Sequence, residues 1–175
     1  MKKSSTRTVI VIAAVLILLV AAFLFYSRPM TIPQRYPMLA LDKCSGITGY
    51  YFDGTGAAPE EFTIDKNSEE FEMLCNLLYE KDYRRSLRDL FPNDTTRYHS
   101  TTQPDEFLWE VFFHFEDVEF PDGSISSRIP LRIQSWFGEL EIHFDGDMLS
   151  CNTNKQKVWE REVLDTILRA TETAA

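Results

Sequence analysis

An unbroken hydrophobic run dominates the N-terminal part of the chain. It starts at Val9 and ends at Tyr26, and its eighteen residues include no charged residue, proline or glycine. In a helix these residues would extend about 27 Å at about 1.5 Å per residue, close to the roughly 30 Å hydrocarbon thickness of a bilayer. The run therefore predicts a transmembrane helix over residues 9–26, after a short basic segment over residues 1–8.

Hydrophobic and polar residues alternate over much of residues 106–151, which predicts β-strands with one buried face. Residues 121–123, Pro-Asp-Gly, fit a three-residue hairpin loop whose glycine adopts the left-handed conformation. A four-residue loop would place Phe113 opposite Arg132, so we reject it. The pairs predicted from the three-residue loop are Phe120 with Ser124, Phe115 with Ile129, Phe113 with Leu131, Val111 with Ile133, Glu116 with Arg128 and Phe112 with Arg132.

Two shorter loops extend this hairpin into a four-stranded antiparallel meander. Residues 137–138 form the first loop, and residues 145–146, Asp-Gly, are typical of a type I′ turn. Pro130 conflicts with a central strand because proline donates no backbone hydrogen bond, so we expect a bulge or a different strand boundary there. The pairs predicted across the two loops are Ile133 with Ile142, Leu131 with Phe144, Ile142 with Leu149 and Leu140 with Cys151.

Two segments carry hydrophobic residues at three- and four-residue spacing and predict amphipathic helices. The first begins at Asn67, with Glu70 completing a capping box, and the second begins at Thr153, with Gln156 in the same role. Their hydrophobic stripes comprise Phe71, Leu74, Cys75, Leu78 and Tyr79 in the first helix, and Trp159, Val163, Ile167 and Ala170 in the second.

The order of these elements predicts an α+β domain. Residues 47–53 and 62–65 add a hairpin before the first helix, which gives the order β-β-α-β-β-β-β-α. An antiparallel meander with one hydrophobic face would then pack against two helices in a two-layer arrangement. Between the hydrophobic run and the domain, regularly spaced prolines predict an extended stalk. The chain thus divides into residues 1–8, the transmembrane helix 9–26, the stalk 27–41 and the domain 42–175.

The charges that flank the hydrophobic run predict its orientation. Lys2, Lys3 and Arg7 precede the run, whereas only Arg28 follows it closely. The positive-inside rule therefore places the N-terminus in the cytoplasm and the domain outside, in a single-pass membrane protein. The alternative is a secreted domain released by signal-peptide cleavage near the small residues 20–22. The hydrophobic run continues past that position, which favours the uncleaved anchor.

Overall charge narrows the classes of partner. Residues 29–175 contain 14 basic and 27 acidic residues, a net charge of −13. Nucleic acid is disfavoured as a partner because its phosphates would be repelled. The predicted partners are the lipid bilayer, through residues 9–26, and a protein or small anionic ligand outside the cytoplasm.

The three cysteines do not define a metal site. Cys44, Cys75 and Cys151 include no C-x-x-C pair and are odd in number. One disulfide with one free thiol is an alternative for a domain outside the cell. We expect Cys75 and Cys151 to be small buried apolar residues, a common role of cysteine.

One candidate binding site is a basic cluster that is unusual in so acidic a domain. Arg84, Arg85 and Arg88 could bind a carboxylate, a phosphate or a lipid headgroup. The alternative is that these arginines pair with the neighbouring Asp82 and Asp89 on a solvated surface.

A second candidate site is the polar face of the predicted sheet. The register places Arg132 between Phe112 and His143, where its guanidinium could anchor a small anionic ligand or a peptide carboxylate. The alternative is an ordinary solvated face with compensating charges. The polar residues predicted on this face are Glu110, His114, Arg132, Glu141, His143 and Asp145.

Catalytic and cofactor motifs are missing from the sequence. It contains no H-E-x-x-H, G-x-S-x-G or Walker motif, and residues 145–150 lack the glycine of a calcium loop. No cofactor or metal is therefore predicted. The sequence favours a membrane-anchored extracytoplasmic domain that acts by binding, in an accessory, sensor-like or envelope interaction role of bacterial style. The alternative is an extracytoplasmic enzyme of unknown class that uses polar residues of the sheet face.

Overall fold

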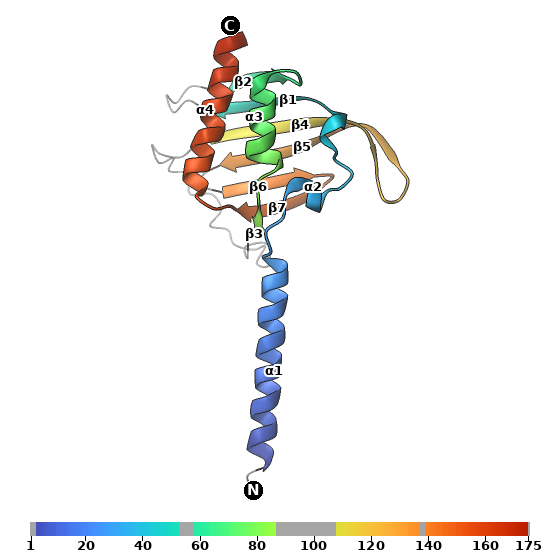
Figure 1. Cartoon of the computed structure of the whole chain (residues 1–175), viewed down its shortest axis with the longest axis vertical. Helices are drawn as coiled ribbons and strands as arrows, with labels where there is room; N and C mark the ends of the chain where they lie inside the picture. The colour runs from blue at the N-terminus through green and yellow to red at the C-terminus, as the bar shows by residue number, and fades with distance from the viewer. Residues whose placement is uncertain (1–2, 53–57, 87–107, 137–138, 175) are drawn as a thin grey trace.

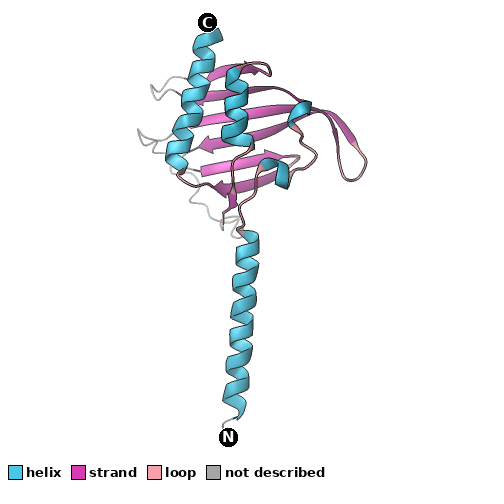
Figure 2. Ribbon diagram, viewed as in Figure 1, coloured by secondary structure: helices cyan, strands magenta, loops and turns pink. Residues whose placement is uncertain are grey.

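The protein has an α+β fold, as the sequence predicts. The computed structural model describes residues 3–52, 58–86, 108–136 and 139–174. Within these residues, four helices accompany an antiparallel sheet of seven strands (Figures 1 and 2). The helices are α1 (Lys3–Tyr26), α2 (Ile32–Arg35), α3 (Glu69–Leu74) and α4 (Gln156–Ala174), with a 3-10 turn at Leu41–Lys43 and a π-helical turn at Cys75–Tyr79. The strands are β1 (Cys44–Phe52), β2 (Glu60–Asp65), β3 (Arg84–Arg85), β4 (Leu108–Glu119), β5 (Ile125–Trp136), β6 (Glu139–Phe144) and β7 (Asp147–Asn152).

The strands lie in the order β2-β1-β4-β5-β6-β7-β3, and all neighbours are antiparallel. The predicted hairpin is β1-β2, and the predicted meander is β4 to β7. The two-residue strand β3 was not predicted. The predicted registers are confirmed for Phe115 with Ile129, Phe113 with Leu131, Val111 with Ile133, Glu116 with Arg128, Phe112 with Arg132, Ile133 with Ile142, Ile142 with Leu149 and Leu140 with Cys151.

The turns have the geometry that their sequences predict. Gly123 and Gly146 have φ angles of 83° and 79°, in the left-handed region where glycine meets no steric penalty. The backbone N–H of Phe120 donates to the carbonyl of Ser124 at 2.8 Å, which closes the three-residue loop. The loop at residues 137–138 lies outside the described residues. The strands on either side of it have the predicted register at Ile133 and Ile142, but the predicted pair of Leu131 with Phe144 does not form, because the pairing of β5 with β6 begins only at Arg132.

Pro130 occupies a position in β5 that needs neither a bulge nor a strand end. It lies opposite His114, and the register is the same on both sides of it. The pairing of β5 with β6 begins only at Arg132, so β5 has a single neighbouring strand at Pro130. Proline is tolerated there because one side of the strand has no partner to which an N–H could be donated.

Helices α3 and α4 lie across one face of the sheet (Figure 1). The hydrophobic stripes predicted for both helices are buried, and Ala170 is partly buried against the same core. Trp159 of α4 donates its indole N–H to the carbonyl of Leu77 at 2.6 Å, and its ring meets Trp109 of β4 edge-on at 5.6 Å. One indole ring therefore connects α4 both to the π-helical turn after α3 and to the sheet.

Both helices start later than their predicted caps. Ser68, not Asn67, caps α3, because its hydroxyl oxygen accepts a hydrogen bond from the N–H of Phe71 at 3.1 Å. Thr153 donates its hydroxyl to the carbonyl of Asp82 at 2.9 Å, and α4 begins three residues after it. The predicted cap at Thr153 is wrong because the helix begins only at Gln156.

The segment after α1 differs from the predicted extended stalk. Met30 and Tyr83 exchange backbone hydrogen bonds of 2.9 and 3.0 Å, and α2 follows directly. Ile32 and Leu39 are fully buried in the domain core. Pro33 lies in the first turn of α2, where proline is tolerated because that N–H has no helical partner. The hydrophobic residues between the prolines therefore make this segment part of the domain.

Helix α1 extends away from the domain (Figure 1). Its segment Thr8–Tyr26 has a mean hydropathy of 3.2, and none of it is buried inside the protein. By length and composition this helix is able to cross a membrane, and a signal sequence has the same properties. Both alternatives drawn from the sequence are therefore compatible with the fold.

All three cysteines are free thiols in the core. Cys75 and Cys151 are buried apolar side chains, as predicted. Burial raises the pKa of Cys75 to about 12 and also raises the pKa of Cys44. These thiols are therefore protonated and unreactive at neutral pH.

Candidate functional site

A connected row of polar side chains crosses the sheet face opposite α3 and α4. Arg132 forms an ion pair with Glu110 and donates a hydrogen bond to the side chain of Gln134. Gln134 donates to Glu141 at 2.6 Å, and Glu141 Oε2 lies 3.1 Å from His143 Nε2. The structure thus brings Arg132 and His143 together with the two glutamates that the register predicted beside them.

This polar row is a poor site for an anion. Glu110 and Glu141 are only 8 and 9% exposed, and both carboxylates already contact the groups that an anionic ligand would use. Arg132 also lies 6.0 Å above the ring of Phe112, so its position is fixed from two sides. The geometry therefore favours a structural role for Arg132 over the predicted role as a ligand anchor.

His114 does not join the polar row. Its Nε2 atom lies 2.8 Å from the hydroxyl of Thr48 on the neighbouring strand β1. Burial, and to a lesser extent the charge of Arg128, lower the pKa of His114. His114 is therefore neutral at pH 7 and bonded within the sheet.

The predicted arginine cluster is divided by β3. Arg84 and Arg85 pair with Asn152 and Cys151 of β7, so their side chains point to opposite sides of the strand. Arg84 is exposed, whereas Arg85 is half-buried. Arg88 lies outside the described residues.

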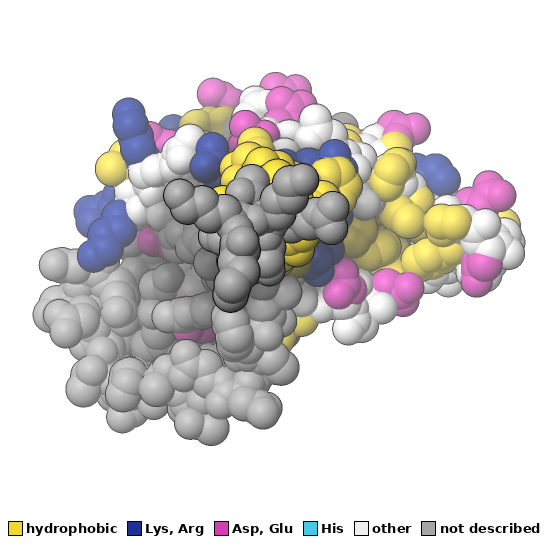
Figure 3. All heavy atoms as spheres, turned by 90° about the horizontal axis from the view of Figure 1, so that it is seen from below, with side chains coloured by type: hydrophobic (Ala, Val, Ile, Leu, Met, Phe, Trp, Pro, Cys, Tyr) yellow, Lys and Arg dark blue, Asp and Glu magenta, His cyan; other side chains and the backbone are white. Residues whose placement is uncertain are grey.

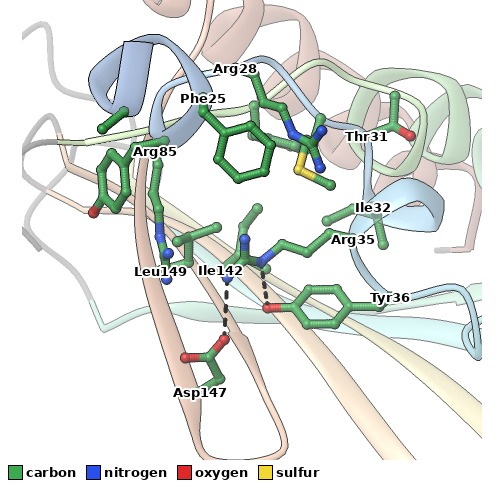
Figure 4. Close-up of a pocket in the computed structure, with 14 residues that line it drawn as sticks. Phe25, Arg28, Thr31, Ile32, Arg35, Tyr36, Arg85, Ile142, Asp147 and Leu149 are labelled. Carbon is green, nitrogen blue, oxygen red and sulfur yellow. Dashed lines mark hydrogen bonds and ion pairs between the residues drawn. The ribbon is translucent and has the colours of Figure 1, made fainter. Parts of the chain in front are cut away.

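A pocket of about 650 Å³ lies where α1 meets the domain (Figure 4). The last turn of α1, helix α2 and strands β3, β6 and β7 all contribute to it. Its hydrophobic lining includes Phe25, Ile32, Tyr36, Ile142 and Leu149. The pocket therefore combines side chains of the apolar helix with side chains of the sheet.

Three arginines and one aspartate are the charged residues of this pocket. The guanidinium of Arg28 lies 4.7 Å from the ring centre of Phe25, and that of Arg85 lies 5.1 Å from the ring centre of Tyr26. Figure 4 shows that Arg28, Arg35 and Arg85 reach the pocket from different sides. The local charge is therefore positive in a domain that is strongly acidic.

Arg35 is held in the pocket by two side-chain contacts. Its Nη2 lies 3.4 Å from Asp147 Oδ2, and its Nε donates to the hydroxyl of Tyr36 at 3.2 Å. Burial lowers the pKa of Arg35, but Tyr36 and Asp147 raise it more, so that pKa lies above its usual value. Burial also raises the pKa of Tyr36, which stays a neutral hydroxyl. Arg35 thus presents a permanent charge at a defined position.

Contacts at the end of α1 hold the pocket together. The hydroxyl of Tyr26 donates to the carbonyl of Ser86 at 3.4 Å, and the strand-like pairing of Met30 with Tyr83 follows four residues later. The domain therefore begins directly at the end of the apolar helix, without an intervening linker.

A second surface is the part of the β4-β5 hairpin that projects beyond the sheet. Ile125 is 69% exposed there, while Phe120 stacks on Phe144 with a centroid distance of 6.2 Å. Viewed along α1 from its N-terminal end, this projection carries hydrophobic and acidic side chains next to each other (Figure 3). No group on the described part of this hairpin indicates a particular ligand.

Sequence reasoning missed most of the pocket. From the sequence, Arg28 is only a flanking charge, Asp147 lies in the incomplete calcium loop of residues 145–150, and Arg35 is not selected at all. The available signal was a tyrosine and an arginine at the end of a hydrophobic run, which is typical of a membrane interface. Arg85 is the one pocket residue that the sequence selected as a candidate.

The described residues contain no group of three histidine, cysteine or acidic side chains that could bind a metal ion. Comparison of the chain with protein-family models, curated proteins and solved structures finds no match. The function is therefore inferred from the pocket itself.

Proposed function

We propose that this chain is a single-pass membrane protein whose acidic domain lies outside the cytoplasm and acts by binding. The length and hydropathy of the segment Thr8–Tyr26, none of which is buried inside the protein, support the anchor. The basic residues before this helix support a cytoplasmic N-terminus. Because the domain begins at the end of α1, it would work at the membrane surface, in an accessory, sensor-like or envelope interaction role.

The observation that carries the binding function is the basic pocket. Arg28, Arg35 and Arg85 line it together with a single carboxylate, Asp147. Guanidinium groups bind phosphate and carboxylate groups through paired hydrogen bonds. Its volume of about 650 Å³ lies within the range of about 300–1,000 Å³ of small-molecule sites. The predicted small anionic ligand is therefore assigned to this pocket, not to the sheet face.

One observation favours the alternative, an enzyme that uses the sheet face. His143 lies 3.1 Å from Glu141, an arrangement that general-base catalysis also uses. The pocket at the end of α1 contains neither residue. Binding therefore has the stronger structural support.

A protease experiment in intact cells tests the membrane topology. Protease added from outside should digest the domain, residues 40–175, and leave a protected fragment that contains α1. A cytoplasmic reporter fused before residue 1 should stay protected in the same cells. Full protection of the domain would reverse the proposed orientation.

Thermal unfolding of the full-length chain in a neutral detergent tests anion binding. The probes are inorganic phosphate, acetate and short-chain anionic phospholipid, compared at equal ionic strength. A bound probe at 100 times its dissociation constant should stabilise the protein by about 2.7 kcal/mol. Arg35→Gln should abolish this stabilisation, whereas Arg161→Gln on the exposed side of α4 should not. If none of the three probes stabilised the wild-type chain, the binding function would be wrong.

A further inference from the structure

We propose that the pocket at the end of α1 binds the phosphate headgroup of an anionic phospholipid from the membrane that α1 spans. This inference rests on the proposed function, since it requires α1 to be in a bilayer. It names the ligand class as a phosphodiester with one negative charge, of the phosphatidylglycerol type.

The position of the pocket agrees with the depth of lipid headgroups. Ala22 and Tyr26, at the end of the apolar segment, both line it. Four helical residues extend about 6 Å along the helix axis. The polar layer on one side of a bilayer is about 5–8 Å thick. With α1 across the membrane, the pocket therefore opens where phosphate groups are concentrated.

The charges of the pocket complement a phosphate monoanion. Asp147 balances one of the three guanidinium groups, through its 3.4 Å contact with Arg35. Among the described residues, no carboxylate forms an ion pair with Arg28, whose guanidinium stacks on Phe25. A phosphate that accepts hydrogen bonds from Arg28 would compensate the charge of that guanidinium. Basic pockets beside membrane helices bind lipid headgroups by the same chemistry.

The hydrophobic side of the pocket favours a lipid over a soluble anion. Phe25 is 68% exposed, and Leu24 on the same turn is 62% exposed, so the outer surface of α1 is apolar up to the rim. An acyl chain could leave the pocket along this surface into the bilayer. A soluble anion would also have to approach a domain of net charge −13, whereas a lipid is already present at high local concentration.

Lipid binding to the full-length chain tests this inference. The chain is purified in a neutral detergent and titrated with dioctanoyl-phosphatidylglycerol, dioctanoyl-phosphatidylcholine or inorganic phosphate, and bound molecules are counted by native mass spectrometry. We expect one saturable site for phosphatidylglycerol, with a dissociation constant at least tenfold lower than for phosphatidylcholine. Inorganic phosphate at millimolar concentration should not displace the lipid.

Two pairs of substitutions with equal charge change test the location of the site. Arg28→Gln with Arg85→Gln should weaken phosphatidylglycerol binding at least tenfold. Arg84→Gln with Arg161→Gln should leave it unchanged, because neither side chain lines the pocket. Arg28→Lys with Arg85→Lys keeps both charges and should retain more binding than the glutamine pair. Circular dichroism of each variant checks that it is folded.

Several results would overturn the lipid assignment. Equal affinity for the two lipids would show that charge is not recognised, and equal losses in the two glutamine pairs would show a general surface effect. Displacement by inorganic phosphate would assign the site to soluble anions and leave the proposed anion-binding function intact. Absence of binding by every probe would refute both proposals.

Discussion

Replacing Arg132 by alanine separates its two possible roles on the sheet face. The sequence predicts Arg132 as an anchor for an anionic ligand, whereas the structure shows it paired with Glu110 and Gln134. If its role is structural, Arg132→Ala removes the charge that compensates a nearly buried carboxylate. The variant should then lose stability and keep the binding properties of the pocket.

The size of this loss follows from the exposure of the two partners. The side chain of Glu110 is 11% exposed and that of Arg132 is 36% exposed. Breaking a fully buried pair costs about 3–5 kcal/mol, whereas an exposed pair contributes about 0–1 kcal/mol. This pair lies between the two limits because water reaches the guanidinium but hardly reaches the carboxylate. We therefore expect Arg132→Ala to lower the free energy of unfolding by about 2 kcal/mol.

Urea unfolding of the full-length chain in a neutral detergent measures this value. Arg128→Ala is a matched control on the same strand and the same face, because the described residues form no ion pair with Arg128, and it should change stability by less than about 0.5 kcal/mol. Adding Glu110→Gln to Arg132→Ala should recover part of the loss, because the unpaired carboxylate is then absent.

Two results would refute this reasoning. An Arg132→Ala protein as stable as the wild type would show that Glu110 does not need its partner. A stable variant that had lost anion binding would restore the ligand-anchor role that the sequence predicts for Arg132.

Three further predictions test the packing of the domain. Gly49→Ala should destabilise the protein by about 2–3 kcal/mol in urea unfolding, because its Cβ would clash with the carbonyl oxygen of Glu110 on β4. The control Gly46→Ala should cost less than about 1 kcal/mol. Equal costs for the two variants would show that the clash does not occur. Cys75, with its pKa raised to about 12, should react with iodoacetamide at pH 8 at least about 100-fold more slowly than in the urea-unfolded chain. The free energy of unfolding should fall as pH rises above about 9, because the thiol then ionises in the unfolded chain but not in the folded one. Rapid labelling of the native chain, read by mass spectrometry, would contradict this prediction. Trp159→Phe removes the 2.6 Å hydrogen bond to Leu77 and should cost about 1–3 kcal/mol in the same unfolding assay; a neutral effect would show that water satisfies this carbonyl.

The meander could be predicted because its determinants are local. A three-residue Pro-Asp-Gly loop fixes which residues face each other, and a shift of one residue would move Phe113 from the core to the polar face. The helix stripes were also predictable, since their spacing places every apolar residue on one side. The helix starts were less predictable, since α3 is capped by Ser68 in place of Asn67 and α4 begins three residues after Thr153.

The polar row on the sheet could be located from the sequence, but its role could not. Register placed Arg132 next to His143 and on the same face as Glu110. Whether a charged side chain is available to a ligand depends on distances between side chains, which register does not determine. The ion pair and the burial of both glutamates became evident only in the folded structure.

The sequence by itself determined the properties that depend on neighbouring residues: an apolar helix long enough to cross a membrane, an acidic α+β domain and the strand registers. Only the tertiary structure decided that the segment after α1 folds back onto β3, which joins Arg28 and Arg35 to Arg85 around one pocket. The physical reason is that Arg28 and Arg85 are more than fifty residues apart along the chain. Nothing local in the sequence specifies a contact over that separation, because it forms only when the hydrophobic residues between the prolines are buried in the core.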